Sequence, residues 1–185
     1  MKVPNSGRKK ALLIIDLQSA FVDSRNNYLV QNIASLIKNM NYDFYASAIF
    51  HAEKNSLWDK QQNWTCPKNS DFHTVEPVNQ LLEPLNVVRV EKETKSIFKG
   101  DKKLLEMLKR KRIEEVHVVG CDTNDCVLAS AFEAFDLGFF TYVIEECCQA
   151  PLEELQVAAL DVLRRQHMTN NSCVEKIDFI TLQHK

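Results

Sequence analysis

The residues of this sequence best placed to do chemistry surround Cys126, in the stretch VVGCDTNDCVLASA at 118–131. A β-branched apolar run at 115–119 precedes it, and no Gly or Pro follows until Gly138. The pattern predicts a strand, a tight turn and a helix capped by Thr123 or Asn124, with Cys126 in its first turn. Unpaired N–H groups and the helix dipole favour an anion there, so the thiol is expected to ionise and act as a nucleophile.

A packing role for Cys126 is the alternative. Free cysteine is among the most buried residue types, and thiol reactivity depends on surroundings that a sequence shows only indirectly. The spacing alone leaves both interpretations open, so other parts of the chain have to decide between them.

Three ordered motifs resemble those of the isochorismatase-like cysteine hydrolases, the superfamily of nicotinamidases, N-carbamoylsarcosine amidases and ureidoacrylate amidases. The nucleophile motif is Gly-x-x-Thr-x-x-Cys-Val at 120–127, and ALLIIDLQSAF at 11–21 is similar to the first strand with its catalytic Asp. The segment KETKSIF at 92–98 is similar to the family's Lys-x-x-x-Ser-Ala-Phe. The resemblance extends from about residue 11 to residue 150, in order and at family-like separations.

The resemblance implies a catalytic triad. Asp16 would be the general base, Lys92 would stabilise the thiolate, and Cys126 would be the nucleophile. It also implies a cis peptide between Cys121 and Asp122, which would aim the N–H groups of Asp122 and Cys126 at one point as an oxyanion hole. The family more often has a small apolar residue in place of Asp122, whose carboxylate either points away or selects a cationic substrate group.

Each of the other two triad residues has a simpler alternative. An Asp at the end of a first strand can cap the next turn, so Asp16 without the other motifs would be a capping residue. A Lys in a charged stretch is usually solvated, and only the position of Lys92 after a strand and before 96–98 distinguishes it.

The long irregular stretch at 51–77 is expected to recognise the substrate, since such loops often do. Metal-dependent nicotinamidases resemble the chain here but have Asp and His where Ile49 and Thr65 stand, so only His51 of that ligand set remains. One imidazole is a poor divalent site, and we expect neither metal nor cofactor; His51 is either a hydrogen-bonded loop residue or a pocket residue. The candidates for the substrate pocket are aromatic side chains and one imidazole: Phe21, His51, Trp58, Trp64 and Phe98.

Composition limits the possible partners. The chain has 185 residues, 45% hydrophobic and 26% charged, with a net charge of −2, which gives no electrostatic reason to expect nucleic acid or an anionic membrane. No apolar run approaches the length of a membrane span, and the N-terminus lacks a signal-peptide pattern. We therefore expect a cytoplasmic protein whose six cysteines are reduced.

Hydrophobic periodicity predicts alternating strands and helices. The expected strands cover 11–15, 44–50, 87–90, 116–119, 139–144 and, at one edge, 172–177. The expected helices cover 32–40, 78–85, 101–111, 126–137 and 153–167. This order predicts one α/β domain over 1–185, with 1–10 as a flexible N-terminal segment and a doubly wound, Rossmann-like, mostly parallel sheet of about six strands.

The function expected from these features is covalent hydrolysis of a C–N bond in a small amide or carbamoyl-type substrate, through a thioester. Hydrolysis of a vinyl ether such as isochorismate is one alternative, although those enzymes commonly lack the nucleophilic Cys. A non-catalytic binding member of the fold is the other. We also expect a homo-oligomer, a dimer or larger.

Overall fold

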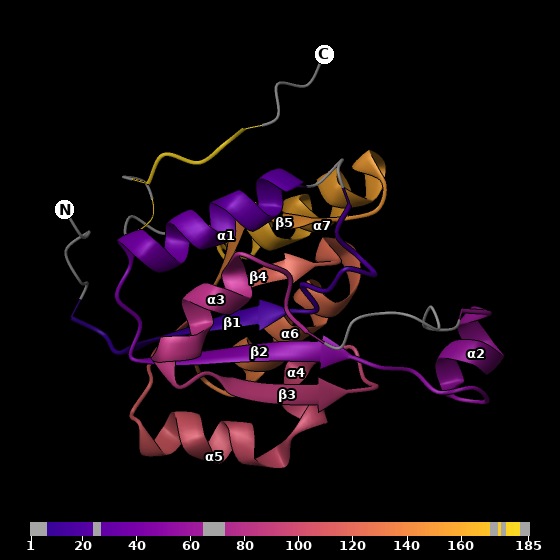
Figure 1. Ribbon diagram of the computed structural model, residues 1–185, viewed down its shortest axis with the longest axis horizontal. Helices are drawn as coiled ribbons and strands as arrows, with labels where there is room; N and C mark the ends of the chain where they lie inside the picture. The colour runs from indigo at the N-terminus through magenta and orange to yellow at the C-terminus, as the bar shows by residue number, and fades with distance from the viewer. Residues whose placement is uncertain (1–6, 24–26, 65–72, 171–173, 175–176, 182–185) are drawn as a thin grey trace.

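The computed structural model describes residues 7–23, 27–64, 73–170, 174 and 177–181. Its centre is a parallel sheet of five strands in the order β3-β2-β1-β4-β5, and the arrows of β1, β2 and β3 point the same way in Figure 1. The strands are β1 (Lys10–Ile15), β2 (Phe44–Phe50), β3 (Val88–Lys92), β4 (Glu115–Cys121) and β5 (Phe140–Gln149). The parallel α/β architecture predicted from the sequence is confirmed.

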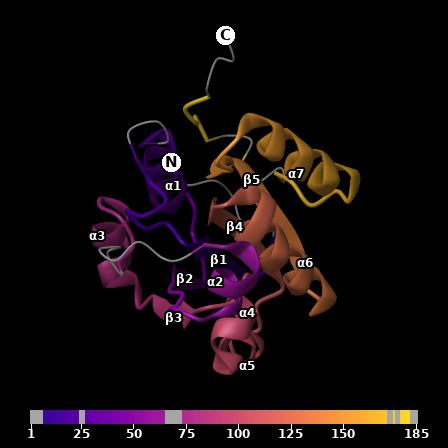
Figure 2. The ribbon, with the colours of Figure 1, turned by 90° about the vertical axis from the view of Figure 1, so that its right-hand side faces the viewer.

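Helices cover both faces of the sheet (Figure 2). One face packs against α1 (Asn27–Asn39) and α3 (Val78–Leu82), the latter continued by a 3₁₀ turn at Glu83–Leu85. The other packs against α4 (Ile97–Gly100), α5 (Lys102–Arg110), α6 (Leu128–Asp136) and α7 (Glu153–Arg165). The short helix α2 (Leu57–Gln62) lies beyond the carboxyl ends of the strands (Figure 1).

The central strand β1 shows why the sequence forms two layers. All of its side chains are buried, and they alternate between the two cores: Leu12 and Ile14 contact the α1 side, whereas Leu13 and Ile15 contact the α6 side. A strand apolar at nearly every position is what a sheet covered on both faces requires.

The structure corrects the expectation of a sixth strand at 172–177. The sheet has five strands in the described part of the chain, with Val174 in a turn and Ile177 in a bend. Residues 171–173 and 175–176 lie outside the described residues. The preceding Thr169 makes only an isolated parallel bridge to Val143 of β5.

Part of the segment 1–10, expected to be flexible, belongs to the sheet. Lys10 is the first residue of β1 and is fully buried, with its Nζ 3.8 Å from Glu115 Oε1. The same carboxylate oxygen lies 2.9 Å from His117 Nε2. A buried charge of this kind requires ionic and hydrogen-bonding partners, which β4 provides. Residues 1–6 lie outside the described part.

No helix in the described ranges combines the length and the apolar character needed to cross a membrane.

Candidate active site

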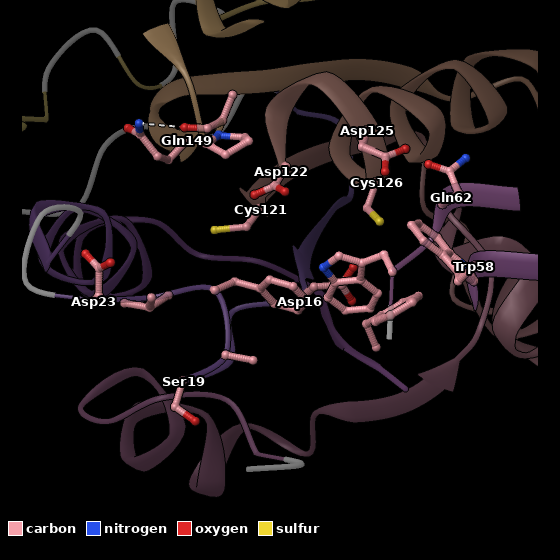
Figure 3. A pocket seen from close by; sticks show the side chains of 17 residues that line it. Asp16, Ser19, Asp23, Trp58, Gln62, Cys121, Asp122, Asp125, Cys126 and Gln149 are labelled. Atoms are coloured by element: carbon pink, nitrogen blue, oxygen red, sulfur yellow. Dashed lines mark hydrogen bonds between the residues drawn. The ribbon is translucent and has the colours of Figure 1, made fainter. Parts of the chain in front are cut away.

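The candidate site lies at the carboxyl end of the sheet, where the strand order changes direction between β1 and β4. Ligands of doubly wound sheets bind at such a switch point. A cavity of about 690 Å³ opens there, and Figure 3 shows its side chains. Asp16 reaches it from the end of β1, and Cys126 from the turn after β4.

Asp16 and Lys92 form a buried ion pair beneath the cavity. Lys92 Nζ lies 2.6 Å from Asp16 Oδ2 and also donates to the carbonyl of Thr94 at 2.9 Å. Asp16 is 2% exposed and Lys92 is 3% exposed, so water screens the attraction between their charges only weakly. A link across the sheet from β1 to β3 thus fixes one oxygen of the carboxylate.

The other oxygen of that carboxylate is available. Asp16 Oδ1 is buried and makes no hydrogen bond of normal geometry to any described group. Burial has the largest effect on the pKa of Asp16 and raises it. Lys92 lowers this pKa, and the nearby Cys126 thiol lowers it more weakly. Since buried polar atoms are nearly always paired, this orphan oxygen marks a place where a proton or a ligand group can be accepted.

Contacts with the backbone and with an aromatic ring hold Lys92 in position. A Cβ on Gly100 would lie 2.6 Å from Lys92 Cβ, so the first turn after β3 can approach the lysine only because residue 100 has no side chain. The N–H of His51 donates to the Lys92 carbonyl at 2.9 Å, and Lys92 Nζ lies 5.1 Å from the centre of the Phe50 ring. The lysine is therefore fixed from both ends.

Gln18 anchors the strand end that carries Phe50. Its Nε2 donates to the Phe50 carbonyl at 3.1 Å, and its Oε1 accepts the Phe50 N–H at 2.6 Å. Gln18 is fully buried, so both hydrogen bonds are shielded from water. The sequence pattern indicates only a loop at this residue and gives it no role.

Cys126 lies in a π-helical turn, Thr123–Val127, that leads into α6. The carbonyl of Asp122 accepts hydrogen bonds from the N–H of Asp125 at 3.0 Å and from the N–H of Val127 at 3.2 Å. The N–H of Cys126, which lies between them in the sequence, does not donate to this carbonyl. The helix expected from 126 is thus an α-helix from Leu128 preceded by a π turn, an arrangement frequent at functional sites.

The turn itself depends on Gly120. This residue has φ +119, and a Cβ there would lie 2.0 Å from the carbonyl oxygen of Ile15 in the neighbouring strand. Only glycine permits this approach of β4 to β1. The peptide bond between Cys121 and Asp122 is cis, as the family resemblance implied.

The surroundings of Cys126 favour the neutral thiol, whereas the sequence led us to expect an ionised one at a helix start. Burial raises the pKa of Cys126 well above its usual range, Asp16 raises it further, and Lys92 lowers it only in part. The cation that was expected to stabilise the thiolate is paired with Asp16 instead. In Figure 3 the Cys126 sulfur points into the cavity, and the Cys121 sulfur points in a different direction.

Three of the five expected pocket residues line the cavity: Phe21, Trp58 and Trp64. Phe21 stacks on Trp64 with ring centroids 6.2 Å apart, and Phe50, which the sequence places only in a strand, packs edge-on against Trp58 at 4.8 Å. The Trp58 indole donates to the Glu93 carbonyl at 2.7 Å, which attaches α2 to the segment after β3.

The other two expected pocket residues do not line it. Phe98 is buried in the core of the α6 side, stacked on Phe139 at 6.4 Å, because α4 turns its side chain under the sheet. His51 lies beyond β2 and uses its backbone to fix Lys92.

Several polar lining residues carry no sequence signal. They come from the loop after β1, from α2, from the π turn and from the end of β5: Ser19, Asp23, Gln62, Asp125 and Gln149. Only the acidic character of the turn at 122–125 is visible in the sequence.

The residues that the structure describes do not fit a divalent metal. Among the described residues, no three His, Cys, Asp or Glu side chains are arranged to hold an ion. His51 has Ile49 before it in the strand, and residue 65, which lies outside the described part, is a threonine. These side chains supply none of the additional ligands that an imidazole site needs.

Comparison with known proteins places these features in a family. The model of the isochorismatase domain matches residues 10–175. The uncharacterized isochorismatase family protein YrdC of Bacillus subtilis (strain 168) is 30% identical over 148 residues, which cover 77% of this chain and 74% of YrdC.

Solved structures share the fold at lower identity. The nicotinamidase SaPncA from Staphylococcus aureus has a TM-score of 0.70 and 22% identity, and the match covers 88% of this chain and 99% of the SaPncA chain. PnC1 from L. infantum, in complex with nicotinate, has a TM-score of 0.71 and 19% identity, with coverage of 93% and 97%. The pyrazinamidase of Pyrococcus horikoshii, in complex with zinc, has a TM-score of 0.68 and 18% identity, with coverage of 88% and 97%.

Proposed function

Because the chain belongs to the isochorismatase family of hydrolases, we propose that it is a metal-independent cysteine hydrolase that cleaves the C–N bond of a small amide or carbamoyl compound. The observation that supports this most strongly is the orphan oxygen of Asp16, buried in the cavity that Cys126 shares. Nicotinamidases and pyrazinamidases with the same fold also act on amides, which agrees with a C–N bond as the target.

The first half of the reaction forms a thioester. Asp16 Oδ1 accepts the thiol proton of Cys126 as the sulfur attacks the amide carbonyl carbon, so the negative charge moves from the carboxylate to the carbonyl oxygen. Collapse of the tetrahedral intermediate breaks the C–N bond, and the protonated Asp16 returns the proton to the leaving amine. Lys92 lowers the pKa of Asp16 against the larger effect of burial, and so favours the ionised carboxylate that this step needs.

The second half releases the acid. Asp16 takes a proton from a water molecule while the water oxygen attacks the thioester carbon. The C–S bond then breaks, and Asp16 passes the proton to the Cys126 sulfur. The backbone N–H groups of Asp122 and Cys126 are the proposed donors to the oxyanion in both halves. The elevated pKa of Cys126 agrees with this cycle, in which the thiolate forms only as the attack proceeds.

Ammonia release from a library of small primary amides tests the proposal. Turnover is expected for the wild-type protein and absent for Cys126→Ser. Intact-mass analysis should detect an acyl adduct on Cys126, the most exposed of the four described thiols at 7%. Activity that survives Cys126→Ser, or that disappears on treatment with a chelator, would contradict a metal-independent cysteine hydrolase.

A further inference from the structure

The cavity is lined by four carboxylates, of which two are neutralised by nearby lysines. Asp16 is paired with Lys92, and Asp125 forms an ion pair with Lys95. Neither Lys nor Arg is among the lining residues that the structure describes. Asp23, in the loop after β1, also interacts with another group of the protein. The fourth carboxylate belongs to Asp122, beside the nucleophile.

Asp122 has no counter-ion in the described structure. Its side chain makes no hydrogen bond to the helix that follows it, and no described residue forms an ion pair with it. Burial, and then the negative charges of Asp125 and Asp16, raise the pKa of Asp122 to about 6. A partly buried carboxylate without a partner is costly, and a cation from outside the chain would remove that cost.

Aromatic rings provide a second feature that attracts cations. Phe21, Phe50, Trp58 and Trp64 line the same cavity and contact one another. The faces of such rings carry negative electrostatic potential and bind ammonium groups. One of them already does so within the protein, since Lys95 Nζ lies 4.6 Å from the centre of the Trp58 ring.

We propose that the substrate of this cavity is a small amide that carries a positive charge, an ammonium or quaternary ammonium group for which Asp122 is the counter-ion. The proposal rests on the proposed function, because it assigns the amide end to Cys126. The N–H of Asp122 is the proposed oxyanion donor and its carboxylate is the proposed cation acceptor, so only a few bonds separate the scissile carbonyl from the charge. The same lining disfavours an anionic substrate such as a dicarboxylate.

Binding can be tested apart from turnover with two amides of the same shape. Trimethylammonioacetamide carries a permanent positive charge, and 3,3-dimethylbutanamide replaces its nitrogen by carbon. The chain has two Trp residues, both of which line the cavity, so tryptophan fluorescence reports on this site, with titration calorimetry as a second measurement. The protein is the full chain with Cys126→Ser, in which neither amide is consumed.

The cation is expected to bind at least about tenfold more tightly than its neutral isostere. Adding Asp122→Asn should lower the affinity for the cation by at least about tenfold and leave that for the neutral amide within about twofold. Asp136→Asn, which removes the same charge at an exposed position at the end of α6, should change neither. Equal affinities for the two isosteres, equal losses on Asp122→Asn, or no measurable binding of the cation at millimolar concentrations would overturn the proposal.

The two proposals fail in different ways. Asp122-dependent binding of the cation without ammonia release from any cationic amide by the wild-type protein would support the cation site and contradict the hydrolase. Ammonia release from neutral amides, with the cationic isosteres neither bound nor cleaved, would support the hydrolase and overturn the cation site.

Discussion

Lys92 Nζ contacts one oxygen of the Asp16 carboxylate at 2.6 Å, and the other oxygen is buried without a hydrogen bond in the cavity that Cys126 also lines. The lysine therefore pairs directly with the proposed base and lowers the pKa of the Cys126 thiol only in part. Its charge lowers the pKa of Asp16 and so opposes the larger effect of burial, which raises that pKa. The roles of the two residues are inseparable in this geometry.

The first prediction concerns turnover. Asp16→Asn removes the proton acceptor, and Lys92→Met removes the cation that favours the ionised acceptor, so each should lower kcat/KM by at least about 100-fold. Because both act on the same proton, the double variant should be scarcely worse than either single one. Steady-state ammonia release measures all three.

Lys99→Met provides the matched control for this series. Lys99 is 65% exposed and forms an ion pair with Glu133 at 2.8 Å, so its loss should leave turnover nearly unchanged. Losses that multiply in the Asp16/Lys92 double variant would show that the two residues act independently, against the shared role assigned to them.

The same pair gives a second prediction, on stability. Either single substitution leaves one buried charge without its partner and should lower the free energy of unfolding by about 3–5 kcal/mol. The double variant removes both charges, so it should be more stable than either single variant although it is equally inactive. Urea unfolding of the four proteins measures this, and additive losses would argue against a desolvated pair.

Gly100 gives a third prediction, because it lies against the lysine rather than in the cavity. In Gly100→Ala the new Cβ would lie 2.6 Å from Lys92 Cβ and 2.8 Å from Val90 Cγ1, so the turn or the lysine must shift. Displacement of the pair should lower kcat by at least about tenfold while KM changes little, since Lys92 does not line the cavity.

Gly138→Ala is the comparison variant for Gly100→Ala. A Cβ on Gly138 would meet open space, but the residue has a φ of +93, so its substitution should cost about 1 kcal/mol of stability and leave kcat unaffected. If Gly100→Ala has wild-type kcat, the turn after β3 does not position Lys92.

The strands at the centre of the fold were predictable from local sequence. The predicted range of β2 coincides with the observed one because Phe44–Phe50 is apolar enough to be buried at every position. β5 extends to Gln149, well past the predicted end at 144, because its acidic residues are partly exposed at the edge of the sheet and keep strand geometry there. The short helices α2 and α4 were missed because four to six residues give too little periodicity.

The site was predictable only where a motif carried it. Asp16, Lys92 and Cys126 each lie at or just after the end of a strand, so parallel topology alone brings them to one edge. The pairing of Lys92 with Asp16 and the lining by Asp23 and Gln149 depend on contacts between distant segments. No local pattern encodes such contacts.

Asp122 supports the last prediction, on how stability depends on pH. The folded-state pKa of Asp122, about 6, lies above the ordinary value of 3.8, so its ionisation disfavours the folded state. The penalty is absent below pH 4, grows as the pH rises towards 6, and is complete above that. Asp122→Asn removes it, and the variant should exceed the wild type in unfolding free energy by about 1–3 kcal/mol at pH 8 and by almost nothing at pH 4.

Urea unfolding at several pH values, with the free protein, measures this difference. Asp136→Asn is again the control, because an exposed carboxylate should give a difference near zero at every pH. Asp125, Asp16 and Cys121 are the titratable groups that interact with Asp122, and all three remain in the variant. A variant less stable than the wild type at pH 8 would mean that Asp122 has a favourable partner within the chain, which would also remove the reason for a cation from outside it.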